Sequence, residues 1–251
     1  MISRVAKQTG LRVKPAMTSA WQIISFAIIV LTGDIKGRKN AMDTGYRIID
    51  MKTWKRAAHC EVFRNIALPK YDVTVELDIT NFYRTIKTKN LPFTFSFIFA
   101  VTKCANEIEE FRYRFIKGDF VLYDKINTSF TYLDEKTELF KVVNVKTRDS
   151  LDEYVKAASG AAKSQAEYFT GPLGNDIFQF SGVPWIKYTH VSHTHNGNPE
   201  NATPMFDWGK YYEKDGKLCL PFSVCVHHSF VDGIHIGRLI DRLQKYLNGN
   251  I

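Results

Sequence analysis

Two adjacent histidines near the C-terminal end of the chain stand out for their chemistry. His227 and His228 are followed by Asp232 and Gly233. A histidine can take a proton from a hydroxyl group and return it later in a reaction. In the alternative interpretation, both histidines merely end a strand and Asp232 caps the next helix. An isolated H-x-x-x-D pattern does not decide between the two, but an H-H-x-x-x-D-G pattern between a strand and a helix favours a catalytic base.

The residues before the histidines predict the element that positions them. Alternating apolar residues predict a strand from Leu218 to His228, the longest in the chain. Because side chains alternate between the two faces of a strand, His228 shares a face with Val224 and Val226, whereas His227 points the other way. Only one of the two histidines can therefore occupy a site at the end of this strand, and the pattern alone does not choose between them.

The residues after the histidines predict a helix. Asp232 is well placed to cap a helix running to Leu247, and Gly233 permits a tight turn between strand and helix. This helix has one apolar stripe, and Gly249 ends it. A base at this junction would be held by a rigid scaffold.

The rest of the chain predicts an α+β fold with helices on one face of a mixed sheet. Helices and strands are both present, without the strict alternation of a parallel α/β protein. The predicted helices cover residues 54–63 (with Thr53 as N-cap), 80–87, 92–108 and 149–167. The predicted strands cover residues 71–78, 120–123, 130–133, 139–143 and 177–181.

Composition indicates a globular protein. The chain has 251 residues, of which 45% are hydrophobic, and a net charge of +8. Residues 1–41 carry seven basic residues and one acidic residue, which leaves a net charge of only +2 for residues 42–251. No long basic stripe exists there to follow a phosphate backbone, so we expect no nucleic-acid partner.

The N-terminal segment differs from the rest of the chain. Basic residues precede an apolar run over residues 21–31, which is too short to span a membrane comfortably. This segment could be a weak membrane anchor, a poor signal peptide or an upstream extension. We favour an extension over residues 1–41 that packs poorly on the fold, and a single domain over residues 42–251 with no membrane contact.

Neither the cysteines nor a histidine-rich loop predicts a metal site. No two cysteines form a CxxC pair, so we expect buried, reduced thiols in a cytoplasmic protein. His190, His193 and His195 lie close together, but no carboxylate or cysteine stands near them at ligand spacing. We expect them to belong to a surface loop. The four cysteines are Cys60, Cys104, Cys219 and Cys225.

The segment His227–Gly233, with the following residues to Arg238, resembles the active-site signature of the chloramphenicol acetyltransferase family. The resemblance holds in order and spacing across residues 42–247. It is carried by Trp54-Lys55-Arg56, Leu77-Asp78-Ile79-Thr80, Glu110-Phe111-Arg112, Phe130–Glu138, Ser181-Gly182-Val183-Pro184-Trp185 and Gly209-Lys210-Tyr211. It implies a two-layer α+β fold, a homotrimer with active sites in clefts between subunits, and acetyl transfer from acetyl-CoA to a hydroxyl group without a permanently bound cofactor.

The resemblance also implies roles for individual residues. His228, the second histidine of the pair, would be the general base, and Ser181 would hydrogen-bond the oxyanion. Asp232 would form a buried, structural ion pair with Arg56. The acceptor would be bound by Phe63, Tyr71, Phe169 and Asp207, and acetyl-CoA by Trp185, Lys210 and Tyr211.

Three of these positions depart from the family pattern. Phe63 stands where tyrosine is typical, Tyr71 where phenylalanine is usual, and Asp207 where threonine is normal. A carboxylate near a developing oxyanion is unfavourable unless it is protonated or turned away. The sequence therefore predicts acyl transfer by His228, with chloramphenicol as the leading acceptor and antibiotic resistance as the role. The alternatives are a different alcohol acceptor, or a non-catalytic relative that binds a ligand. A dihydrolipoyl acyltransferase is disfavoured, because no lipoyl domain or Ala/Pro-rich linker is present.

Overall fold

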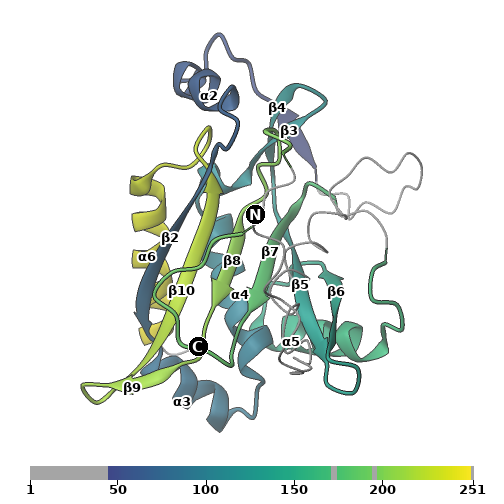
Figure 1. Ribbon diagram of the computed structural model, residues 1–251, viewed down its shortest axis with the longest axis vertical. Coiled ribbons are helices and arrows are strands. Elements are labelled where there is room, and N and C mark those ends of the chain that lie inside the picture. The colour runs from purple at the N-terminus through teal and green to yellow at the C-terminus, as the bar shows by residue number, and fades with distance from the viewer. Residues whose placement is uncertain (1–44, 171–173, 194–196, 250–251) are drawn as a thin grey trace, which may run out of the picture.

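The structure is a computed structural model that describes residues 45–170, 174–193 and 197–249. The extension expected over residues 1–41 lies outside the described residues, as does His195. Figure 1 shows a large sheet with helices packed behind it and a smaller sheet beyond one end.

The large sheet is mixed, as the sequence predicts. Strand β7 lies between β5 and β8 and runs parallel to both, whereas the other pairs are antiparallel. Strand β9 (Tyr212–Lys214) pairs with β10 outside the main order. That order is β2 (Lys70–Asp78), β10 (Lys217–His227), β8 (Met205–Trp208), β7 (Ile177–Gly182), β5 (Asn127–Asp134) and β6 (Leu139–Val145).

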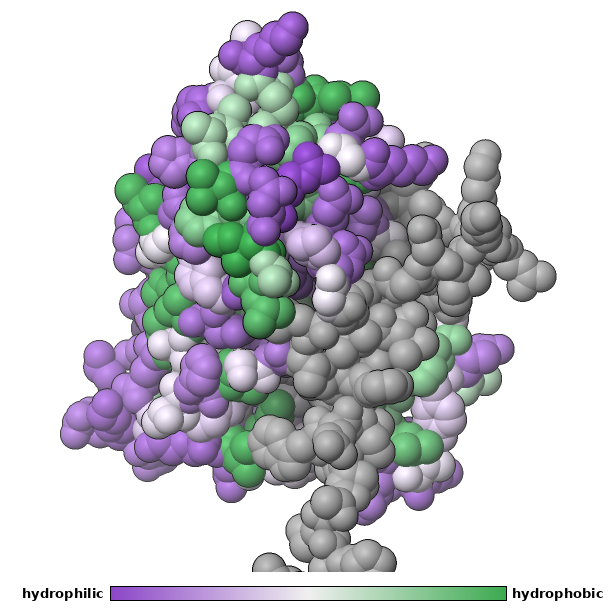
Figure 2. Space-filling view, turned by 45° about the horizontal axis from the view of Figure 1, so that its top comes forward, coloured by the Kyte–Doolittle hydropathy of each residue, from purple (hydrophilic) through white to green (hydrophobic). Residues whose placement is uncertain are grey.

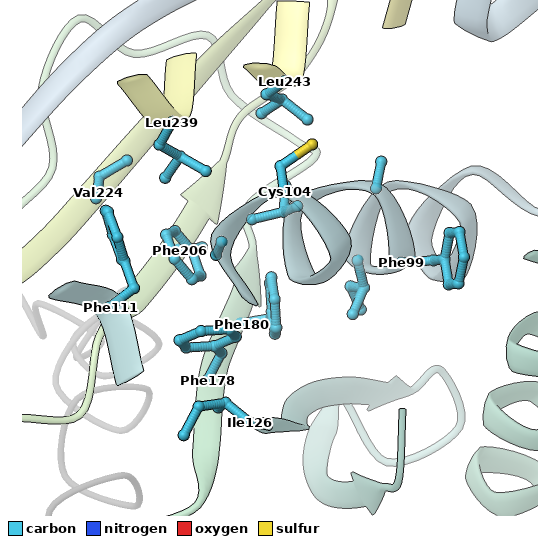
Figure 3. Close-up of a cluster of buried hydrophobic side chains, with 14 of the residues drawn as sticks. Phe99, Cys104, Phe111, Ile126, Phe178, Phe180, Phe206, Val224, Leu239 and Leu243 are labelled. Carbon is cyan, nitrogen blue, oxygen red and sulfur yellow. The ribbon is translucent and has the colours of Figure 1, made fainter. Parts of the chain in front are cut away.

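Helices cover one face of this sheet, which confirms the α+β class. Helix α4 is buried along most of its length, and it packs against α5 and α6 as well as against β5 and β7. Its residues Phe99 and Cys104 lie in the same core as Phe180 and Phe206 from the sheet (Figure 3). The helices of this layer are α3 (Thr80–Thr88), α4 (Phe93–Asn106), α5 (Leu151–Ser164) and α6 (Gly233–Asn248).

A smaller sheet and a short helix lie at the end of the molecule where β10 ends (Figure 1). Strand β4 (Asp119–Tyr123) is its central strand, between β1 (Tyr46–Ile48) and β3 (Tyr113–Ile116), with the 3-10 helix η1 (Glu109–Arg112) before β3. Helix α2 (Ala57–Arg64) begins later than predicted. The prediction of Thr53 as its N-cap is wrong, because the Thr53 hydroxyl bonds to Asp50 in the preceding turn.

The two faces of the large sheet differ in polarity. Phe180, Phe206 and Phe222 are buried on the face that the helices cover. On the opposite face, Ser181, Asp207 and Ser223 are aligned in register across β7, β8 and β10. Thr74 of β2 continues this row, and its hydroxyl is 2.7 Å from that of Ser223. The sheet therefore presents a polar row on the face away from the helices.

All four cysteines are buried and free, as predicted. Among the described residues, no helix is long and apolar enough to cross a membrane.

Candidate active site

The two histidines after the last sheet residues occupy different environments. His227 is 1% exposed; its Nε2 donates to the carbonyl of Pro199, and its Nδ1 accepts from the backbone N–H of Ser229. Burial lowers the pKa of His227 to about 4, so its imidazole is neutral and fully hydrogen-bonded. The His228 side chain is 36% exposed and points the other way, as the strand periodicity predicts. Of the two, only His228 has a ring that can meet a ligand.

Aromatic rings hold the His228 side chain. Phe63 stacks on it with centroids 3.8 Å apart and planes 3° from parallel, and Tyr71 lies 4.7 Å away at 39°. The Tyr71 hydroxyl donates to the carbonyl of Val231. His228 Nδ1 is 3.1 Å from an oxygen of Asp232, but it has no hydrogen-bond partner among the described residues. The orientation of the ring therefore depends mainly on its two aromatic neighbours.

Arg56 fixes the loop that carries His228. Its two terminal nitrogens each lie 2.5 Å from an oxygen of Asp232, and it also donates to the carbonyls of His228 and Ser229. Hydrogen bonds from Arg56 hold the pKa of Asp232 below its usual value. The side chains of Arg56 and Asp232 are 11% and 32% exposed, so the expectation of a buried ion pair is corrected to one that is partly exposed on the aspartate side.

His235 contributes to the same junction, and sequence reasoning missed it. The backbone N–H of Asp232 donates to His235 Nδ1 at 2.9 Å, which is the reverse half of a capping box. His235 Nε2 faces Glu110 at 3.4 Å. The spacing of three residues from Asp232 could have indicated this contact, although glutamate or glutamine is the usual residue at that position.

Ser181 does not lie beside His228 within one chain. It belongs to the polar row, whereas His228 contacts Tyr71 on the side of the sheet that faces the helices. Along β10, His228 is five residues beyond Ser223, the member of the polar row on that strand, which corresponds to about 17 Å. Within the described residues of a single chain, the predicted base and the predicted oxyanion donor are therefore far apart.

Asp207 has a partner that the sequence did not predict. His193 Nε2 lies 2.8 Å from Asp207 Oδ2, and the two side chains are 8% and 1% exposed. The expectation that His193 belongs to a surface loop is therefore wrong, because the β7–β8 connection folds back over the sheet and buries its ring. Burial raises the pKa of Asp207, although His193 counteracts this effect. Burial acts to lower the pKa of His193, but the Asp207 carboxylate outweighs it and the net shift is upward.

The remaining predicted site residues lie away from His228. Phe169 is 44% exposed and contacts Phe140 of β6, at the opposite edge of the sheet from β2. Trp185 and Lys210 are exposed beyond the ends of β7 and β8. Tyr211 is 39% exposed, and its hydroxyl meets that of Tyr83 on α3 at 3.2 Å. Within one chain, the predicted site residues therefore form two separate groups. One group surrounds His228, and the other lies near β6, β7 and β8.

Metal ligation was a possible role for the histidine-rich loop. His190 is exposed and His193 is paired with Asp207. Within residues 45–170, 174–193 and 197–249, no group of three potential metal ligands is present.

A histidine and an aspartate, His228 and Asp232, lie at the junction of the longest described strand and the last described helix. The protein family described as chloramphenicol acetyltransferase matches residues 44–244. A chloramphenicol acetyltransferase from Escherichia coli is 32% identical over 207 residues, which cover 81% of this chain and 94% of the relative. One from Klebsiella sp is 31% identical over 206 residues, with the same coverage. The chain belongs to the chloramphenicol acetyltransferase family.

Solved structures show the same fold. A structure titled chloramphenicol acetyltransferase, 24% identical, superposes with a TM-score of 0.76 over 81% of this chain and all of that one. A probable dihydrolipoamide acetyltransferase from Listeria monocytogenes, 17% identical, has a TM-score of 0.56 over 83% of this chain and 96% of that chain. The second structure shows that the architecture extends to other acyltransferases.

Proposed function

We propose that this protein transfers the acetyl group of acetyl-CoA to a hydroxyl group of chloramphenicol, with His228 as general base. The observation that carries the proposal is the ring of His228, which is partly exposed, stacked on Phe63, in contact with Tyr71, and carried on a loop fixed by Arg56. Relatives that match most of the chain are named chloramphenicol acetyltransferase, and the proposed acceptor is taken from these names. Antibiotic resistance in the cytoplasm is the corresponding role.

The proposed reaction uses a neutral His228. Its Nδ1 faces Asp232, so Nε2 is the nitrogen free to take the proton of the acceptor hydroxyl. The acceptor oxygen then bonds to the thioester carbonyl carbon, and Ser181 donates a hydrogen bond to the oxygen that becomes negative. The carbon–sulfur bond breaks, and CoA leaves as a thiol that takes the proton back from His228. Acetyl-CoA is a co-substrate, and the proposal includes no permanently bound cofactor.

The proposal places each active site between two subunits of a homotrimer. One chain separates His228 from Ser181, so a second copy would have to supply Ser181 to the His228 of the first. Phe169 would then approach the acceptor, and Trp185, Lys210 and Tyr211 would approach acetyl-CoA, from that same second copy. Asp207 is 1% exposed and bonded to His193, so the proposal gives it no contact with the acceptor. Figure 2 shows apolar side chains exposed in patches between polar ones. Near His228, the exposed apolar residues include Val62, Ile66 and Leu68, which suits a contact between subunits.

A thiol-release assay with acetyl-CoA and chloramphenicol tests the reaction. We expect His228→Ala to abolish release, and His227→Gln to retain it, because His227 is buried and bonded to backbone groups. Circular dichroism of both variants checks that each is folded. Tight binding of chloramphenicol without release from any of a panel of alcohols would indicate a ligand-binding protein instead, and release with another alcohol alone would change the acceptor.

Mixing two inactive variants tests where the site lies. Trimers reassembled from His228→Ala and Ser181→Ala chains contain interfaces at which both wild-type halves meet, so about one quarter of wild-type activity should return. A site built within one chain would give no recovery. Sedimentation analysis of the wild type measures the expected trimer independently.

A further inference from the structure

A buried histidine–carboxylate pair borders Ser181, and the reaction proposed above makes no use of it. His193 and Asp207 meet at 2.8 Å with side chains 8% and 1% exposed. Asp207 is the register partner of Ser181 on a neighbouring parallel strand, so the two side chains leave the same face of the sheet from backbones about 4.8 Å apart. A carboxylate therefore stands next to the hydroxyl that would stabilise the oxyanion.

In the polar row of the sheet, the hydroxyl hydrogen of Ser181 and the Oδ1 acceptor of Asp207 are not used by the hydrogen bonds described so far. The Thr131 hydroxyl donates to Ser181 Oγ at 3.5 Å, which leaves the hydrogen of Ser181 available to another group. Asp207 uses Oδ2 for His193, whereas its Oδ1 is buried and has no hydrogen-bond partner among the described residues. An unrestrained Asp207 could accept the hydrogen of Ser181 through this oxygen and so remove the donor that the oxyanion needs.

Other titratable groups also face the pair. On β2, Lys70 and Asp72 act on His193 in opposite directions. Cys225 on β10 and Tyr188 in the β7–β8 connection are weak acids whose pKa values are raised by burial, so both stay neutral. The Asp207 carboxylate shifts the pKa of His193 upward, which favours an imidazolium paired with the carboxylate.

We propose that His193 is a positioning residue for acyl transfer. It holds the Asp207 carboxylate by hydrogen bond and charge, so that the hydroxyl of Ser181 donates to the substrate oxyanion rather than to Asp207. This inference rests on the proposed function of Ser181 and His228. It makes the carboxylate at position 207 compatible with an oxyanion site, because the carboxylate is bonded to His193 and is not free to take the hydrogen of Ser181.

Replacing His193 with glutamine tests the inference through the pH profile of kcat. Without His193, the Asp207 carboxyl loses the charge and the hydrogen bond that oppose the effect of burial, so its pKa rises further and it becomes an unpaired carboxylate only on the alkaline side. We expect His193→Gln to lose kcat relative to wild type increasingly as the pH rises, because Asp207 is then ionised without a partner to hold it. At pH 8 the loss should be about 10-fold or more, with an upper limit near the 10²–10³-fold effect of one oxyanion donor. KM for acetyl-CoA should stay within about twofold.

A second substitution separates this role from a structural one. His193→Gln combined with Asp207→Asn removes the carboxylate, so kcat at pH 8 should return to within about threefold of wild type and the additional loss at alkaline pH should disappear. His190→Gln, at an exposed position of the same loop, is the matched control and should leave the profile unchanged. Thermal unfolding of each variant measures any loss of fold.

The possible outcomes distinguish this inference from the proposed function. A wild-type protein without acetyl transfer overturns the function and, with it, this role for His193. An active wild type with an unchanged His193→Gln profile overturns only the role of His193. A deficit that is the same at every pH and that Asp207→Asn does not relieve also overturns it, because such a deficit comes from packing alone.

Discussion

The rings of Phe63 and His228 lie face to face, with centroids 3.8 Å apart and planes 3° from parallel. Since no hydrogen bond from the described residues holds His228 Nδ1, this stacking and the contact with Tyr71 set the direction of the ring. An aromatic pair is worth about 0.5–1.5 kcal/mol beyond the area that it buries. Phe63, which departs from the family pattern, is therefore in direct contact with the proposed base.

Phe63→Leu should lower kcat. The leucine keeps apolar contact but loses the flat face against His228, so the ring samples unproductive orientations and kcat falls about 2–10-fold. Steady-state kinetics with acetyl-CoA and chloramphenicol measures the effect. Glu61→Ala, at an exposed position on α2, is the control and should be neutral. An unchanged kcat in Phe63→Leu would show that the stacking does not orient the base.

Arg56→Ala should lower the free energy of unfolding by about 2–4 kcal/mol, since it removes four hydrogen bonds to one loop, two of which go to Asp232. The value lies near the lower end of the range for buried pairs because Asp232 is 32% exposed. Urea unfolding measures it. Arg242→Ala breaks an exposed pair with Glu107 and should cost less than about 1 kcal/mol. Equal losses in the two variants would contradict the anchoring role of Arg56.

His227 should make the protein less stable in mild acid. Its pKa is lowered by burial to about 4 in the folded protein, below the ordinary value near 6.5, so the unfolded chain binds the proton more readily. The stabilisation is fully present above about pH 6.5 and is lost as the pH falls toward about 4, by up to about 3 kcal/mol. Urea unfolding at a series of pH values measures the slope. His227→Gln should flatten the slope, and His190→Gln should not; equal slopes in wild type and His227→Gln would refute the assignment.

Gly182→Ala should destabilise the sheet near the polar row. A Cβ at position 182 would lie 2.8 Å from carbons of the Trp208 indole, which is 4% exposed and cannot move freely. Such overpacking costs about 1–3 kcal/mol. Gly160→Ala is the matched control, because nothing lies within 4 Å of its Cβ and alanine favours helix α5 by about 0.5–1 kcal/mol. Thermal unfolding should therefore move in opposite directions for the two variants.

Much of the fold could be predicted because its signals are local. Alternation predicted β2 and β10 closely, and Ser150 caps α5 through the N–H of Glu153. The start of α2 was predicted poorly, because Thr53 competes for the preceding turn instead of capping the helix. Local patterns of this kind report which residues share a face, but not which distant segment covers that face.

The sequence by itself determined that His227 and His228 point in opposite directions, since alternation along a strand requires it. The tertiary structure decided that His227 is sealed against Pro199, that Phe63 stacks on His228, and that Ser181 lies on the other face. It also joined His193 to Asp207, 14 residues apart, through the path of a loop with no periodic signal. Strand order and loop path depend on packing over the whole chain, so no local spacing encodes these contacts.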